Sequence, residues 1–175
     1  MKSLLKIADI KNESYVNGPG VRTVVWVQGC SIRCKGCFNP SLQNFDKGRL
    51  YHPEDLAKEL SEISSDGLTI SGGEPLDQNN GLYQMIKYFK LISGKAILLF
   101  TGYGYKQIKK SPKKLRTVLS VDAAVCGSYK EGAIWCNKQL LLITRRISPN
   151  DIKPHNNLEL SIRDGHAFLT GYPNI

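Results

Sequence analysis

The most informative part of the sequence is residues 21–37, which read VRTVVWVQGCSIRCKGC. The first eight residues are mostly β-branched or aromatic, and they predict a strand over residues 21–28. Three cysteines follow at once, Cys30, Cys34 and Cys37, in the spacing C-x3-C-x2-C. A structural zinc site or an ordinary ferredoxin cluster takes four protein ligands. The local set here stops at three, and a cubane cluster held by three cysteines would leave one iron without a protein ligand.

The rest of the chain alternates strand and helix patterns. Strands are expected at residues 21–28, 68–70, 96–101 and 121–125, and helices at 53–64, 82–92 and 113–119. Strands separated by helices normally lie parallel, with right-handed crossovers. Each of these strands runs into a glycine, at Gly29, Gly72, Gly102 and Gly127. The pattern predicts an α/β fold with a site at the carboxyl ends of its strands, where glycine lets the backbone approach a ligand.

The C-terminal part has a different pattern. Residues 158–163 and 166–170 alternate around Asp164-Gly165, which predicts a β-hairpin. We expect this hairpin to close or edge the sheet by pairing with residues 4–10. A complete eight-stranded α/β barrel needs about 250 residues. The 175 residues of this chain instead predict a partial barrel, in a single domain over residues 1–175.

Two motifs carry a family resemblance. The cysteine spacing, followed by Phe38, resembles the signature of the radical S-adenosylmethionine (SAM) superfamily. The segment Ser71-Gly72-Gly73-Glu74-Pro75 resembles the glycine-glycine-glutamate element that holds the amino group of SAM in that family. The resemblance implies a partial (β/α) barrel of the radical SAM type, with the C-terminal β-hairpin as an addition.

A narrower resemblance covers residues 13–140. Residues 17–22, Phe38-Asn39-Pro40 and Thr101-Gly102-Tyr103 are similar to glycyl-radical-enzyme activases, most of all to the activating proteins of anaerobic ribonucleoside-triphosphate reductase. Trp135 and Gln139 fall near that group's tryptophan-to-glutamine segment. The chain departs from the group at Cys126, where an aspartate is usual.

The resemblance implies a cofactor set and a reaction. Cys30, Cys34 and Cys37 would bind a [4Fe–4S] cluster and so form the catalytic and metal site of an oxidoreductase. The implied SAM-binding residues are Gly36, Phe38, Gly72, Gly73, Glu74, Thr101 and Gly102. Reductive cleavage of SAM would give a 5′-deoxyadenosyl radical, which abstracts hydrogen from a glycine of a large partner enzyme. The electron would come from a low-potential donor such as flavodoxin or ferredoxin.

Other interpretations stay open at the level of sequence. The chain could be a radical SAM enzyme that modifies a peptide or small molecule, or a non-catalytic iron–sulfur or zinc module. Asn17, Gly18, Gly20 and Arg22 could contact a partner's glycine loop or simply form a tight turn. Cys126 and Cys136 are too few to ligate a second cluster alone. For Cys126 we expect a position facing the SAM pocket, and for Cys136 the role of a small buried hydrophobe.

The formal net charge of +9 is concentrated in residues 106–116, which carry six lysines or arginines. This run indicates either a solvated helical face or a docking patch for an acidic redox partner. Pro112 interrupts it and no aromatic ladder accompanies it, so we expect no nucleic-acid binding.

No apolar stretch is long enough to cross a bilayer, and residues 1–6 do not resemble a signal peptide, so we expect a cytoplasmic protein without membrane contact. Five cysteines, an odd number, favour metal chemistry over disulfides.

Overall fold

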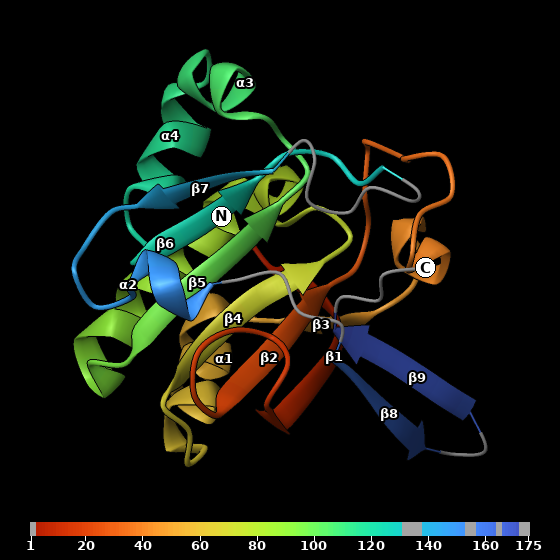
Figure 1. The fold of residues 1–175 in the computed structure, drawn as a ribbon, viewed down its shortest axis with the longest axis horizontal. Helices are drawn as coiled ribbons and strands as arrows, with labels where there is room; N and C mark the ends of the chain where they lie inside the picture. Colours follow the sequence, from red (N-terminus) through yellow and green to blue (C-terminus); the bar gives the residue numbers. More distant parts are fainter. Residues whose placement is uncertain (1–2, 131–137, 153–156, 164–165, 172–175) are drawn as a thin grey trace.

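The computed structural model describes residues 3–130, 138–152, 157–163 and 166–171. The strands are β1 (Leu5–Ser14), β2 (Arg22–Val27), β3 (Arg49–Tyr51), β4 (Gly67–Gly72), β5 (Ala96–Thr101), β6 (Ala123–Cys126), β7 (Gln139–Leu142), β8 (Leu158–Arg163) and β9 (His166–Gly171). The α-helices are α1 (Pro53–Glu62), α2 (Asn79–Ser93), α3 (Tyr105–Lys109) and α4 (Pro112–Val118). Short 3-10 turns occupy Pro40–Gln43, Pro75–Gln78 and Pro149–Asp151. Figure 1 shows the arrangement.

Seven strands form one mixed sheet in the order β3-β1-β2-β4-β5-β6-β7. The four central strands β2, β4, β5 and β6 run parallel, as the alternation of strands and helices predicted. β1 pairs antiparallel with both β2 and β3, and β7 pairs antiparallel with β6. The α/β class is therefore confirmed.

One face of the sheet is covered by α1 and α2, which lie side by side (Figure 1). α1 begins at Pro53, and Glu54 and Asp55 in its first turn complement the positive end of the helix. α2 ends at Gly94, which takes the left-handed conformation with φ 63°. The apolar residues of both helices are spaced at helical intervals, so they fall on one side. They pack against the strands in a shared core, whose largest fully buried apolar side chains are Leu5, Leu56, Leu60, Leu68, Ile70, Leu76, Leu82, Met85, Ile86, Phe89 and Ile97.

The opposite face is covered partly by irregular chain. Gly18 lies so close to β5 that an added Cβ would stand 2.8 Å from Leu98 Cδ2. The Thr69 hydroxyl donates to the carbonyl of Asn17 at 2.7 Å, which fixes the same segment to β4. Ile147 packs over β5 and β6 against Leu98 and Val125. This coverage seals the amino-terminal half of the face.

Arg22 has a structural role. Only 1% of the residue is exposed, and its Nη2 donates to the carbonyls of Leu68 at 2.6 Å and Ala96 at 3.0 Å. Burial lowers the pKa of Arg22 to about 10, partly offset by Asp66 and Asp122. For Arg22 the structure supports the structural role, because the guanidinium is enclosed between strands.

The hairpin is present, but its predicted place is wrong. β8 and β9 pair antiparallel from Leu158↔Gly171 to Arg163↔His166, and they form a two-stranded sheet separate from the main one. The Asp164-Gly165 turn lies outside the described residues. At residues 5–7 the pairing is prevented because β1 already has β2 on one edge and β3 on the other.

Side-chain contacts attach the hairpin instead. The carboxylate of Glu159 accepts from the Tyr15 backbone N–H at 2.6 Å and from Ser14 Oγ at 2.8 Å. It also forms an ion pair with Lys11 at 3.2 Å. A second attachment joins the Thr170 hydroxyl to the Asn17 amide at 3.0 to 3.1 Å.

Within the described part of the chain, no helix has the length and apolar character that a membrane span requires.

Candidate functional site

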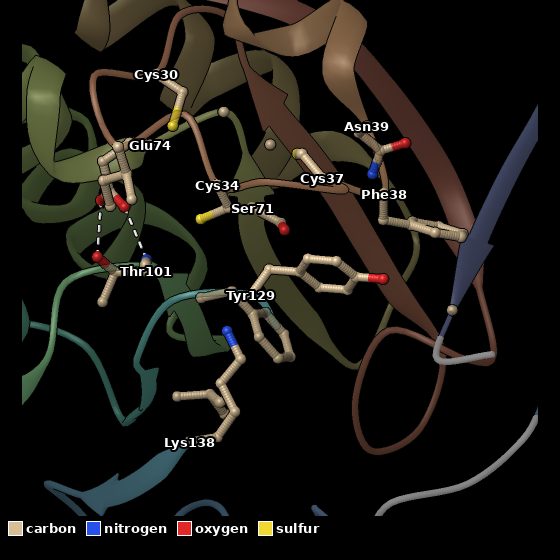
Figure 2. A pocket seen from close by; sticks show the side chains of 17 residues that line it. Cys30, Cys34, Cys37, Phe38, Asn39, Ser71, Glu74, Thr101, Tyr129 and Lys138 are labelled. Carbon is tan, nitrogen blue, oxygen red and sulfur yellow. Dashed lines mark hydrogen bonds between the residues drawn. The ribbon is translucent and has the colours of Figure 1, made fainter. Parts of the chain in front are cut away.

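A pocket of about 180 Å³ lies at the carboxyl ends of the parallel strands (Figure 2). Every residue that the sequence predicted for the site lines it except Gly36. The lining residues are Cys30, Ile32, Cys34, Cys37, Phe38, Asn39, Ser71, Gly72, Gly73, Glu74, Phe100, Thr101, Gly102, Val125, Tyr129, Lys138 and Gly171. Segments that follow β2, β4 and β5 thus meet around one cavity, as the glycine pattern predicted.

The three cysteines lie on the loop after β2 (Figure 2). Cys30 is buried, whereas Cys34 and Cys37 are partly exposed, and all three are free thiols. The loop turns tightly, with Arg33 at φ 49° and the Cys37 N–H donating to the Cys34 carbonyl at 3.3 Å. Burial raises the pKa of the Cys30 thiol, while N–H groups of Arg33 and Ile32 directed at its sulfur lower it in part. Backbone donors aimed at a sulfur favour the thiolate, which is the form that binds metal.

The donor set of the pocket consists of three cysteine thiols from one loop, and cysteine thiolates are the ligands that iron–sulfur clusters take. The pocket between the thiols offers soft sulfur donors, which suit an iron–sulfur cluster.

The Gly72-Gly73 pair is required by close packing of two loops. Gly72 has φ 113°, and an added Cβ would lie 2.4 Å from the Val27 backbone nitrogen. At Gly73 an added Cβ would lie 2.2 Å from the carbonyl oxygen of Gly29. The Gly73 N–H donates to the Val27 carbonyl, and the Glu74 N–H to the Gly29 carbonyl, each at 2.9 Å. Glycine at both positions therefore brings the cysteine loop and the end of β4 together.

Glu74 is fully buried and connects β4 to β5. One carboxylate oxygen accepts from the Thr101 hydroxyl at 2.7 Å and from the Leu76 N–H at 2.9 Å. The other accepts from the Gly102 N–H at 2.7 Å. Burial raises the pKa of Glu74 to about 7, although these three donors favour the ionised form. The carboxylate therefore fixes the Thr101-Gly102 backbone at the edge of the pocket.

A second carboxylate braces the cysteine loop from outside. Asp77 accepts from the Ser31 backbone N–H at 2.8 Å and from the Tyr103 hydroxyl at 2.7 Å. The Tyr103 hydroxyl also lies 3.2 Å from Ser31 Oγ. The loop after β5 thus reaches the residue that directly follows Cys30.

Sequence reasoning missed several lining residues. Ser71 and Asn39 adjoin predicted motifs and could have been added by their position alone. Tyr129 and Lys138 come from the connection between β6 and β7; Lys138 lies in the segment from Trp135 to Gln139, to which the resemblance gave no pocket role. Lys138 donates to the Gly127 carbonyl and is the only cationic side chain among the described residues that line the pocket. Burial lowers the pKa of Lys138, while Cys34, Glu74 and Cys126 raise it in part.

The predicted position of Cys126 is wrong. Its side chain packs in the core with Leu99 and Ala124, and Val125 faces the pocket in its place. Alternation along β6 explains the difference, since neighbouring residues of a strand point to opposite faces. Burial raises the pKa of the Cys126 thiol to about 12, so it stays protonated. Trp135 and Cys136 lie outside the described residues.

Comparison with known proteins identifies the family. Residues 16–140 match the family model described as a 4Fe-4S single cluster domain. The anaerobic ribonucleoside-triphosphate reductase-activating protein of Enterobacteria phage T4 is 36% identical over 123 residues, which are 67% of this chain and 76% of that protein. The protein of that name from Vibrio cholerae is 32% identical over 122 residues, 65% of this chain and 77% of that protein. The pyruvate formate-lyase-activating enzyme of Clostridium pasteurianum is 36% identical over 120 residues, 65% of this chain and half of that longer protein. The chain belongs to the 4Fe-4S single-cluster family and, within the radical SAM superfamily, to the activating proteins of glycyl-radical enzymes.

Proposed function

We propose that this protein activates a large partner enzyme by abstracting hydrogen from one of its glycine residues, with a [4Fe–4S] cluster and SAM as cofactors. The observation that carries the proposal is the single pocket shared by the three cysteines, Gly72-Gly73-Glu74 and Thr101-Gly102. We also infer that the seven-stranded sheet is a partial (β/α) barrel of the radical SAM type. Its parallel centre and the pocket at the carboxyl ends of its strands support that assignment.

Cys30, Cys34 and Cys37 are the proposed cluster ligands. They provide three thiols at one rim of the pocket, and the local turn presents them on one loop. When bound, the cluster and SAM supply the one-electron cleavage that generates a 5′-deoxyadenosyl radical. The protein's contribution is to hold, orient and shield these groups.

Two motifs orient SAM in this proposal. The backbone of Gly72 and Gly73 borders the pocket and offers polar groups to the methionine part. Glu74 positions Thr101 and Gly102, whose backbone borders the ribose side. Phe38 lies beside the place assigned to the adenine. We assign Gly36 the role of a turn with φ 66°, which lets the loop run next to that site.

Apolar side chains complete the pocket and exclude water. Ile32, Phe100 and Val125 join Phe38 in the lining. A reactive radical needs a dry site, because water and other side chains offer competing hydrogen atoms. The one carboxylate of the described lining, Glu74, has both oxygens engaged by hydrogen bonds from the protein.

The central test is SAM cleavage by anaerobically purified, cluster-loaded protein. Dithionite as the reductant should yield 5′-deoxyadenosine and methionine. Cys34→Ala should abolish cleavage and lower the iron content, whereas Lys35→Ala, on the same loop, should leave both near wild type. A Cys34→Ala variant with full iron content and full cleavage would refute the cluster assignment.

The partner is tested separately from cleavage. After incubation with SAM and reductant, a candidate reductase or lyase should show a glycyl-radical EPR signal. SAM cleavage without that signal on any candidate would favour the second candidate function, a radical SAM enzyme that acts on a peptide or small molecule. The match to reductase-activating proteins over most of their length favours the first.

A further inference from the structure

The basic surface formed by α3 and α4 lies next to the cysteine loop. Residues 102–120 carry six lysines or arginines and no acidic residue. Lys106, Lys109, Lys110, Lys113 and Arg116 are exposed. Figure 1 shows α3 and α4 side by side at one edge of the molecule, joined to the carboxyl end of β5. A large part of the net charge of +9 is thus concentrated on one side.

A hollow of about 460 Å³ lies between this surface and the cysteine loop. It is lined by Ser31, Ile32, Gly102, Tyr103, Gly104, Gln107, Gly127 and Ser128. Ser31 and Ile32 come from the cysteine loop, and Gln107 comes from α3. The hollow therefore approaches the loop from the side of α3.

Tyr103 connects the basic surface to the loop by direct contacts. Lys114 Nζ lies 3.1 Å from the centroid of the Tyr103 ring, a close cation–π contact. The Tyr103 hydroxyl donates to Asp77 at 2.7 Å and lies 3.2 Å from Ser31 Oγ. Asp77 in turn accepts from the Ser31 N–H. A continuous chain of contacts thus runs from α4 to the residue next to Cys30.

We propose that the α3–α4 basic surface is the docking site for an acidic, low-potential redox protein, which delivers its electron through the hollow beside Ser31 and Tyr103. This inference rests on the proposed function, because it assumes a cluster on Cys30, Cys34 and Cys37. Charge complementarity selects the partner class, since a concentrated basic surface steers an acidic protein into encounter. One electron leaves the reduced flavin or iron–sulfur group of the donor and enters the cysteine-bound cluster, and no bond in the protein forms or breaks.

The test compares two charge-reversal variants with the same change in net charge. The first is Lys106→Glu, Lys110→Glu and Lys113→Glu on the proposed surface. The matched control is Lys47→Glu, Lys58→Glu and Lys87→Glu, at exposed lysines elsewhere. Reduction of the cluster by reduced flavodoxin is followed by absorbance in stopped flow, over a range of salt concentrations. Binding of oxidised flavodoxin is measured in parallel by calorimetry.

The surface variant should be reduced at least tenfold more slowly than wild type at low salt, with a weaker salt dependence and lost flavodoxin binding. The control should stay within about twofold of wild type. Reduction by dithionite, a small reductant, should be the same in all three proteins. Equal slowing of both variants, an unchanged rate in the surface variant, or binding of duplex DNA in place of flavodoxin would overturn the docking proposal.

The two levels of inference fail in different ways. If dithionite-reduced wild type does not cleave SAM, the proposed function is wrong, whatever the flavodoxin result. If dithionite supports cleavage but flavodoxin and ferredoxin neither bind nor reduce the wild type, the docking proposal alone is wrong.

Discussion

Both ends of the parallel strands contain buried ionisable side chains that hydrogen-bond to the backbone, but these side chains have different roles at the two ends. At the amino-terminal end, Arg22 and Asp122 are buried charged side chains that bond to the backbone of neighbouring strands. Asp122 accepts from the Ile97 N–H at 2.9 Å and the Thr144 hydroxyl at 2.8 Å, and lies 3.4 Å from Lys90 Nζ. At the carboxyl end, Glu74 makes equivalent bonds, but it stands at the wall of a cavity.

The comparison separates buried ionisable groups that support only the fold from one that also shapes the pocket. Arg22 and Asp122 are surrounded by protein, so their loss should lower stability and leave the pocket intact. Glu74 holds Thr101 and Gly102 at the pocket wall, so its loss should change both stability and ligand binding. Four variants test this contrast.

The largest change in stability is expected for Asp122→Ala. The substitution leaves the buried Ile97 N–H without an acceptor and Lys90 without its counter-ion, so the free energy of unfolding should fall by about 3 kcal/mol. Urea unfolding measures the loss. SAM affinity of the folded, cluster-loaded variant at low temperature should match wild type. A large loss of SAM affinity would contradict the proposed separation of the two ends.

Glu74→Gln should remove a pH dependence at the other end. The folded pKa of Glu74 is about 7, above the ordinary value of 4.5, so the native state resists ionisation. The contribution of Glu74 to wild-type stability is therefore greatest below pH 4.5 and falls by roughly 3 kcal/mol as pH rises through 7. The variant should show a flatter profile when cluster-free protein is unfolded in urea between pH 5 and pH 8.

Glu74→Gln should also weaken SAM binding, whereas Asp122→Ala should leave SAM binding unchanged. Glutamine offers one acceptor oxygen in place of two, so either the Gly102 N–H or the Thr101 and Leu76 donors lose their acceptor. Wild-type SAM affinity together with a lost pH dependence would show that Glu74 acts on stability alone.

Lys138→Met should change ligand binding with little change in stability. Its ammonium group is the one cation of the described pocket lining, and SAM carries a carboxylate. We expect SAM to bind about tenfold more weakly, since hydrogen bonds to charged groups contribute roughly 1.5–3 kcal/mol. Equilibrium dialysis against the oxidised, cluster-loaded protein gives the affinity, and Lys130→Met on the neighbouring loop serves as the control. Equal losses in both variants would point to net charge alone.

The smallest effect is expected at the hairpin. Burial raises the pKa of Glu159, but hydrogen bonds from Tyr15, Ser14 and Lys11 outweigh it, so the net pKa lies below the ordinary value. The stabilisation by Glu159 is therefore present at neutral pH and is lost as pH falls through its lowered pKa. Glu159→Gln should weaken the attachment at neutral pH, seen as faster amide exchange in residues 158–171. Glu62→Gln, at an exposed site, should leave exchange there unchanged.

Much of the fold and site followed from local patterns. Residues 96–101 were predicted as a strand with the bounds that β5 has, and the helix predicted at 53–64 differs from α1 only at its end. The pocket was predicted because each parallel strand ends at a glycine beside a motif. These features depend on residues that are close in sequence, so periodicity and spacing suffice to find them.

The features that were missed depend on long-range packing. Lys138 reaches the pocket from the side of β7. It lies between Trp135 and Gln139, a segment noted for its resemblance, but that resemblance assigned no role to the lysine. Cys126 was predicted to face the pocket because it stands at a strand end. Neighbouring residues of a strand point to opposite faces, so Cys126 lies in the core and Val125 lines the pocket. The β8–β9 hairpin was recognised from its turn residues. Which strand it would pair with could not be predicted, because that depends on which edges of the main sheet are already occupied.

The separate hairpin has a consequence for how this fold can vary. Because β8 and β9 add no strand to the main sheet, removing or replacing them would expose no unpaired backbone on β1. The segment also lies beyond the residues that match the family model. Related chains can therefore gain, lose or exchange such an appendage without any re-registering of the main sheet, and such a change would reach the pocket through Gly171 at the end of β9.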